Sequence, residues 1–241
     1  MPVIHALANP ARFLRIARPL TPLLLGAGAL LVVFGAWAGL ALTPPDYLQG
    51  ETVRILYIHV PAAWLGMGGW SGIAISSIAY LVWRHPLANI AARAIALPGA
   101  VFAVICLASG SIWGRPTWGT WWQWDGRLTS MLLLAFVYCG YMALARADAD
   151  RGGDGRLPAL FGIAGSVLLP IIRYSVVWWN TLHQGASIGL TKSSIDSAIL
   201  WPLPIMLAGF TFLFAGIVLM RMRTILALAK AEARMRRMAR A

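Results

Sequence analysis

The chain has 241 residues, of which 59% are hydrophobic and only 12% are charged, and its formal net charge is +12 at pH 7. Apolar runs long enough to cross a bilayer recur along it, which places it among integral membrane proteins and excludes an ordinary soluble domain. The positive charge by itself suggests nucleic acid as a partner, but its placement along the chain argues against one.

Six apolar helices are predicted, and together they define an all-α, polytopic membrane protein. Their approximate ranges are 20–42, 62–83, 94–113, 127–146, 157–178 and 201–221. The first run is too long for a signal peptide and lacks a small-residue cleavage site, so we expect a retained first span. The chain is interpreted as one membrane domain over 1–241, with a core of about 10–222 and a basic tail over 223–241.

The charges of the connections predict the orientation. If the N-terminus is cytoplasmic, fifteen of the twenty Lys and Arg residues fall on the cytoplasmic side, which is the usual positive-inside pattern. Both chain ends are then cytoplasmic, and three longer, more polar connections face outward. The basic tail, Arg221–Arg240, is predicted to contact anionic lipid as a topology anchor, and nucleic acid is not expected as a partner.

The most informative segment connects the third and fourth predicted helices. Residues 113–124 contain five of the twelve tryptophans, which is more than an ordinary interfacial aromatic belt requires. If a short interfacial helix begins at Thr117, then Trp118, Trp121 and Trp122 share one face. Burying a few hundred Å² of a flat ring there is worth about 5–10 kcal/mol before ordering costs. The tryptophans are Trp113, Trp118, Trp121, Trp122 and Trp124.

A surface of indole rings edged by positive charge suits a large, flat, apolar ligand that carries acidic groups, and haem is the obvious candidate. Arginine matches a carboxylate because its planar fork donates two parallel hydrogen bonds. The outward candidates are Arg54, Arg115, Arg127 and Arg173, although each can also be an interfacial side chain that reaches to water. Arg127 is best placed, at the start of a helix beside the indoles, and Asp125 is interpreted as a capping or hydrogen-bonding residue.

Two of the four histidines lie on the outward side. His59 precedes a Val-Pro pair, which predicts a place at the outer edge of the second helix. His183 lies just past the outer end of the fifth helix. Either imidazole alone can be a helix cap, but two on the same side as the indoles can supply both axial ligands of a haem iron. His5 and His85 are expected to be ordinary solvated or interfacial residues.

Other chemistry finds little support in the sequence. Cys106 and Cys139 lie inside predicted helices and belong to no C-x-x-C pattern, so they are interpreted as small packing residues. Covalent attachment of haem through cysteine is therefore not expected. No residue cluster completes a tetrahedral metal shell, and no helical histidine pair indicates a zinc protease.

The run from Trp113 to Thr129 reads Trp-Gly-Arg-Pro-Thr-Trp-Gly-Thr-Trp-Trp-Gln-Trp-Asp-Gly-Arg-Leu-Thr. It resembles the tryptophan-rich signature of the haem-handling cytochrome c assembly proteins. The chain also has six predicted spans, little mass outside the membrane and an outward histidine on each side of the motif. In these features it resembles, over about residues 10–222, the haem exporter protein C family of bacterial cytochrome c maturation.

The resemblance implies that the tryptophan-rich loop holds haem at the periplasmic face of the inner membrane. It implies His59 and His183 as axial ligands of the iron, and Arg54 and Arg127 as candidate propionate contacts. The ligand is expected to be haem b, bound transiently and without a covalent bond. No residue is expected to be catalytic.

The resemblance also implies partners. A periplasmic haem chaperone takes the haem, and the complex includes a small single-span subunit together with the ATPase and membrane subunits of an ABC transporter. ATP chemistry belongs to those subunits, because this chain has no Walker motif.

Three other functions stay open from the residues. A cytochrome c synthase would itself catalyse thioether formation, but relatives of that kind tend to be larger and to have more histidines. A permease for haem or another solute would need a route through the bilayer, and the middles of the predicted helices carry almost no ionisable residues to line one. A quinone-linked b-type cytochrome would usually place its histidines within the spans.

Overall fold

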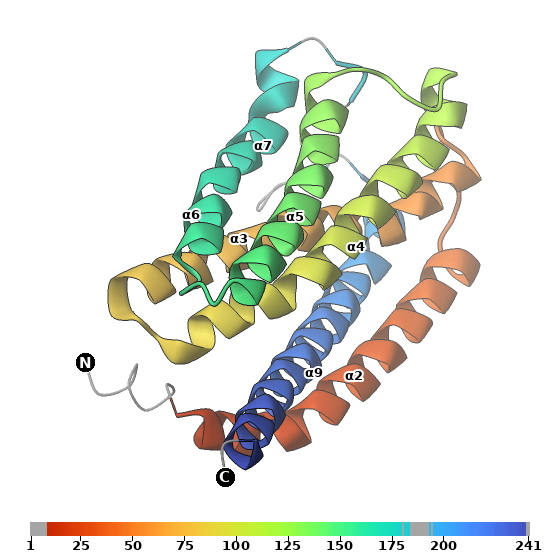
Figure 1. The fold of residues 1–241 in the computed structure, drawn as a ribbon. Coiled ribbons are helices and arrows are strands. Elements are labelled where there is room, and N and C mark those ends of the chain that lie inside the picture. The colour runs from red at the N-terminus through yellow and green to blue at the C-terminus, as the bar shows by residue number, and fades with distance from the viewer. Residues whose placement is uncertain (1–8, 180, 184–192, 194, 240–241) are drawn as a thin grey trace.

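A computed structural model describes residues 9–179, 181–183, 193 and 195–239 of the chain. Within these residues six helical segments are long and apolar enough to cross a membrane, which confirms the predicted all-α, multi-pass fold (Figure 1). The elements are α2 (Pro10–Ala41), η1 (Glu51–Ile55), α3 (Leu56–Trp83), α4 (Pro86–Trp118), α5 (Gly126–Asp150), α6 (Arg156–Ala164), η2 (Gly165–Val167), α7 (Leu168–Trp178), α8 (Ser197–Leu200) and α9 (Pro202–Met238).

The helices form two groups that share one interface. α2 packs along α9, whereas α3 packs along α4, and α5 lies against α4, α6 and α7 (Figure 1). The groups meet where α9 contacts both α3 and α4. The start of α2 and the end of α9 lie at the same end of the bundle, and the connection between α4 and α5 lies at the opposite end (Figure 1). We refer to this opposite end as the outer end.

The largest hydrophobic cluster joins α3, α4, α5 and α7, and Trp70 lies at its centre without any exposed surface. Its ring meets the Tyr138 ring edge to face, with the centroids 4.9 Å apart. The Tyr138 hydroxyl donates to the carbonyl of Gly66 at 2.7 Å, so its polar end is satisfied inside the bundle. Gly99 permits this packing, because a Cβ there would overlap the Tyr138 ring.

Several helices are longer than the sequence predicts, and the difference is largest in α2, α4 (predicted over 94–113) and α9. α2 begins at Pro10, before the predicted start near residue 20, because Asn9 caps it by accepting a hydrogen bond from the backbone of Ala11 at 2.9 Å. α9 continues to Met238, so the predicted basic tail is a helical extension of the last span. Its Ala- and Arg-rich sequence has high helix propensity and contains no glycine or proline.

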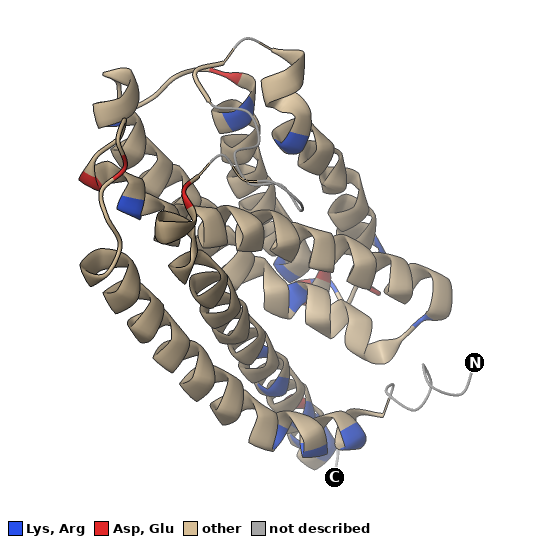
Figure 2. Cartoon of the chain, turned by 180° about the vertical axis from the view of Figure 1, so that it is seen from behind, with Lys and Arg blue, Asp and Glu red and all other residues tan. Residues whose placement is uncertain are grey.

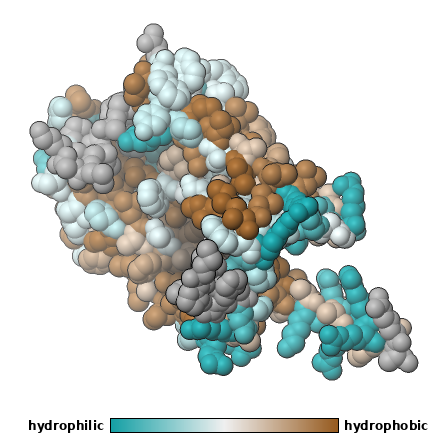
Figure 3. All heavy atoms as spheres, turned by 90° about the vertical axis from the view of Figure 1, so that its left-hand side faces the viewer, coloured by the Kyte–Doolittle hydropathy of each residue, from teal (hydrophilic) through white to brown (hydrophobic). Residues whose placement is uncertain are grey.

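Charge separates the two ends of the molecule. Lys and Arg residues gather at the end where α2 begins and α9 finishes, and fewer lie at the outer end (Figure 2). The side of the molecule in Figure 3 is largely hydrophobic over its middle, with hydrophilic side chains concentrated towards its lower end. Such a surface suits a bilayer, and the positive-inside rule favours the cytoplasmic side for the basic end.

Candidate functional site

Three segments from the sequence-predicted site lie at the outer end. His59 lies in the first turn of α3, the tryptophan-rich connection joins α4 to α5, and His183 follows the end of α7. The Val-Pro pair after His59 does not set the helix start, since α3 begins at Leu56 and contains Pro61. Near a helix start, proline has a suitable φ and removes only one early hydrogen bond.

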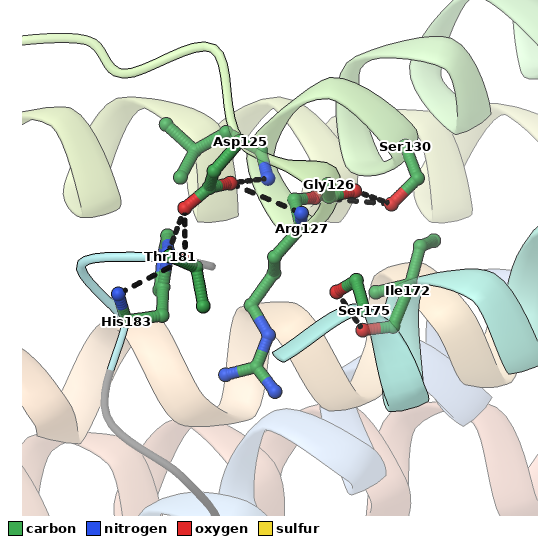
Figure 4. A network of polar contacts seen from close by, with 9 residues as sticks. Asp125, Gly126, Arg127, Ser130, Ile172, Ser175, Thr181 and His183 are labelled. Atoms are coloured by element: carbon green, nitrogen blue, oxygen red, sulfur yellow. Dashed lines mark hydrogen bonds and ion pairs between the residues drawn. The ribbon is translucent and has the colours of Figure 1, made fainter. Parts of the chain in front are cut away.

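His183 is bound to Asp125. The imidazole Nδ1 lies 2.7 Å from Asp125 Oδ2, and the Thr181 hydroxyl donates to the same oxygen (Figure 4). The other carboxylate oxygen accepts the backbone N–H groups of Arg127 and Leu128 and so caps α5. The capping role predicted for Asp125 is confirmed, and the carboxylate also holds the imidazole.

These contacts determine the charge states of both groups. Burial raises the pKa of Asp125, but hydrogen bonds from Thr181, the Leu128 backbone and His183 outweigh it and leave the pKa below its ordinary value. Burial lowers the pKa of His183, although Asp125 acts in the opposite direction. At neutral pH the carboxylate is therefore ionised and the imidazole is neutral. Because an ionised carboxylate only accepts, the proton of His183 lies on Nδ1.

His59 has a weaker acceptor behind it. Its Nδ1 lies 3.0 Å from the Ser109 hydroxyl on α4. That hydroxyl has one proton, which it donates to the carbonyl of Ile105 at 2.7 Å, so it accepts from His59. The proton of His59 therefore also lies on Nδ1. Gly110 leaves room for this ring, because a Cβ there would lie 3.0 Å from His59 Cε1.

In each imidazole a protein group holds Nδ1, which leaves Nε2 as the nitrogen that can bind a ligand. Arg127 lies close enough to His59 for its charge to act on the imidazole, and His183 would do the same if it were protonated. A neutral imidazole whose Nδ1–H is held by the protein is the usual state of a histidine that binds a metal. The arrangement can therefore present two nitrogen ligands at one end of the bundle.

Two of the indoles flank the imidazoles. The Trp113 ring meets His59 edge to face with the centroids 5.7 Å apart, and Trp118 meets His183 at 4.5 Å. Trp113 Nε1 also donates to the Gln49 side chain at 2.7 Å, which ties the end of α4 to the segment before η1.

The remaining tryptophans of the segment are further from the histidines. Trp122 packs against Trp124 with their centroids 5.4 Å apart. Trp121 and Trp124 expose 57% and 74% of their surface, so apolar rings are open at this end of the molecule. The alternative of a separate interfacial helix from Thr117 does not hold: α4 runs through Trp118, and Gly119, whose φ of 77° is left-handed, caps its C-terminus.

The arginines divide by what they contact. Arg54 donates to the carbonyls of Leu40 and Thr43 and pairs with Glu51, so it closes the C-terminus of α2. Arg115 donates to the carbonyl of Gly119 and closes α4 in the same way. These two guanidinium groups are already engaged with the protein.

Arg127 differs from them. Its side chain extends from the start of α5 past Thr181 and His183, and makes no hydrogen bond or ion pair with the described residues (Figure 4). Arg173 on α7 is close enough for its charge to act on Arg127, and it too has no such partner in the described part of the chain. Arg127 therefore lies near both histidines without an acceptor among the described residues, and Arg173 lies close to Arg127.

Sequence reasoning missed the groups behind the imidazoles. The contact between Asp125 and His183 joins residues 58 positions apart, and that between Ser109 and His59 joins residues 50 apart. Ser109 is a polar residue within an apolar helix, which is the one local feature that draws attention to it. The neighbouring sequence does not indicate that its partner is His59.

Comparison with known proteins gives a consistent result. A family model described as Heme exporter protein C matches residues 3–237. The chain is 49% identical over 218 residues to Heme exporter protein C of Bradyrhizobium diazoefficiens, covering 90% of this chain and 82% of the relative. It is 45% identical over 225 residues to the protein of the same name from Escherichia coli K12, covering 93% of this chain and 91% of the relative.

Proposed function

The chain belongs to the Heme exporter protein C family, and we propose that it binds haem b at the periplasmic face of the bacterial inner membrane and delivers it to a haem chaperone for cytochrome c maturation. Binding is non-covalent and transient. The chain is a haem-binding and delivery subunit, and thioether formation takes place on other proteins.

The observation that carries this proposal is that the Nδ1 atom of each outer-end imidazole lies within hydrogen-bonding distance of a protein group, Ser109 or Asp125, which leaves Nε2 as the nitrogen for iron. His59 and His183 are neutral ligands whose other nitrogen is held by Ser109 or Asp125. Hydrogen bonding of the second ring nitrogen fixes the tautomer and the ring orientation that iron needs. Two such imidazoles at one end of a membrane bundle suit the two axial positions of haem iron.

The indoles support the same ligand. Trp113 and Trp118 flank one imidazole each, where they would line the porphyrin plane near the iron. Trp121 and Trp124 are exposed at the outer end and offer apolar area to the ring and to an incoming acceptor. An open apolar surface suits a protein that has to release its ligand to another protein.

Arg127 and Arg173 provide the cations for the two propionates. They lie near each other, and within the described residues neither guanidinium has a hydrogen-bond acceptor of its own. Two arginines without acceptors repel each other, so a dianion between them removes that repulsion and satisfies their donors. The resemblance also implies Arg54 as a propionate contact. We assign it a structural role instead, because it holds the α2 C-terminus beside η1.

The proposed complex supplies what this chain lacks. A periplasmic haem chaperone receives the haem, a small single-span subunit completes the membrane assembly, and ABC-type ATPase and membrane subunits drive release of the loaded chaperone. The sequence has no Walker motif, which is why ATP hydrolysis is assigned to those partners.

The test is the absorption spectrum of detergent-purified protein from cells that make haem. Wild type is expected to carry six-coordinate, low-spin haem, and His59→Ala and His183→Ala are each expected to lose that spectrum while inserting normally. His85→Ala, at the opposite end of the bundle before α4, is the matched control and should retain it. Unchanged haem content and spin state in both outer variants would refute the proposed site.

A further inference from the structure

A groove lies between the two helices of the outermost pair, far from the haem site. α2 and α9 approach most closely at glycines: a Cβ at Gly28 would lie 2.7 Å from the Leu213 backbone, and one at Gly216 would lie 2.8 Å from Leu25. Close contact at small residues is the usual way in which membrane helices pack. Beyond Leu25, towards the end that carries the chain termini, the helices separate and leave a groove of about 710 Å³.

The separation has a cause in the sequence of α2. Pro19 and Pro22 lie inside this helix, and each removes a backbone hydrogen bond and favours a kink. In Figures 1 and 2 the first turns of α2 cross the end of α9, whereas the rest of α2 runs beside it. The groove opens away from α4, because the opposite face of α9 packs its Met222 against Leu87 and Ala94.

The lining combines apolar walls with three cations. Leu14, Leu25 and Ala227 are among the apolar residues, and Arg18, Arg223 and Lys230 supply the charge. No acidic residue lines the groove, and none of the three cations has a hydrogen bond or ion pair within the described part of the chain. An apolar groove lined by several unpaired cations is complementary to a molecule with hydrocarbon chains and an anionic head.

We propose that this groove binds one anionic glycerophospholipid, with its phosphate between Arg18, Arg223 and Lys230 and its acyl chains against the apolar wall. The location suits this ligand. By the positive-inside rule this end of the bundle faces the cytoplasm, where anionic headgroups attract basic side chains at the membrane surface. The volume lies within the range of about 300–1,000 Å³ that is common for sites of small organic ligands.

The bound lipid would stabilise the packing of α2 against α9. It bridges α2 and α9 beyond their glycine contacts, and its anionic phosphate offsets part of the positive charge of the three basic side chains that line the groove. A transmembrane helix of a partner protein would be a poorer occupant, since a typical span is apolar and would bring no anion to the three cations that line the groove.

The experiment measures lipid retained through detergent purification. The protein is reconstituted in phosphatidylcholine vesicles that contain phosphatidylglycerol, re-extracted, and weighed by native mass spectrometry. In detergent there is no charged leaflet, so only a specific site keeps a lipid. Wild type is expected to retain one phosphatidylglycerol, and the triple variant Arg18→Gln/Arg223→Gln/Lys230→Gln to retain it roughly 10- to 100-fold less.

Matched variants separate the groove from general charge. Arg234→Gln/Arg236→Gln/Arg237→Gln removes the same charge from the exposed end of α9 and is expected to behave as wild type. Ala227→Trp fills the groove without changing charge and should also lose the lipid, whereas Ala229→Trp, outside the groove, should not. Equal losses in both triple variants, equal retention of phosphatidylcholine, or a copurifying polypeptide that excludes lipid from the wild-type groove would overturn the proposal.

Discussion

Asp125→Asn is the substitution that tests the haem site most sharply. One carboxylate oxygen caps α5 by accepting from the backbone of Arg127 and Leu128, and the other accepts from His183. An amide has one acceptor and one donor end, so it can serve only one of these positions. If its oxygen keeps the cap, its NH₂ faces His183 Nδ1 and favours the tautomer with the proton on Nε2, which cannot bind iron.

The expected loss of haem-binding free energy follows from the alternative orientation, in which the amide oxygen faces the imidazole. That orientation gives up the N-cap, worth about 0.5–2 kcal/mol. It also replaces a charge-assisted hydrogen bond of about 1.5–3 kcal/mol by a neutral one of about 0.5–1.5 kcal/mol. The total is about 1.5–3.5 kcal/mol, which corresponds to a roughly 10- to 300-fold weaker affinity for haem.

The assay is an absorbance titration of haem into detergent-purified apoprotein. Asp196→Asn is the matched control, because Asp196 caps α8 by accepting from the Ala198 backbone at 2.8 Å and makes no hydrogen bond to an imidazole among the described residues. Ser109→Ala removes only a neutral acceptor from His59 and should weaken binding less than Asp125→Asn does. Equal affinities for Asp125→Asn and Asp196→Asn would refute the role assigned to the carboxylate.

Two further predictions concern the same site. Gly110→Ala is expected to lower haem affinity roughly 10-fold without unfolding the protein, because the new Cβ would lie 3.0 Å from the His59 ring; Gly68→Ala, which meets no atom within 4 Å, is the control in the same titration. Arg127→Gln is expected to weaken haem binding about 10- to 100-fold at an unchanged melting temperature, whereas Arg54→Gln should lower the melting temperature, since it removes the hydrogen bonds that close α2. Thermal melts and haem titrations of both variants check this, and identical behaviour of the two arginines would contradict the distinction.

The spans of this protein could be predicted from its sequence because the length of an apolar run is a local property. The ends of the spans depend on finer features, and there the prediction was less accurate. Asn9 starts α2 early through a side-chain cap, and the helix propensity of the basic tail carries α9 to Met238. The third helix ends at Gly119 instead of giving way to a separate interfacial helix, because one left-handed glycine terminates it.

The candidate site could be predicted in its types of residue but not in its contacts. Imidazoles, indoles and arginines on one side of the membrane are visible in the sequence. Whether an arginine is available for a propionate depends on the backbone carbonyls beside it. Arg54 donates to carbonyls at the end of α2, whereas the Arg127 side chain has no carbonyl acceptor among the described residues. Such a difference arises from packing between distant segments, as does the contact of Asp125 with His183.

The unequal support of the two imidazoles bears on how haem leaves. A carboxylate behind His183 makes it the stronger donor to iron, whereas the Ser109 hydroxyl behind His59 is neutral. An acceptor that brings its own ligand has to displace one of them, and His59 is expected to leave first. Carbon monoxide added to the reduced protein imitates that step, because it replaces the weaker ligand. The adduct of wild type should then have the Fe–CO vibrations of the His59→Ala adduct. Vibrations that match those of His183→Ala would mean that the carboxylate-backed imidazole is the one released, and the order of transfer would be reversed.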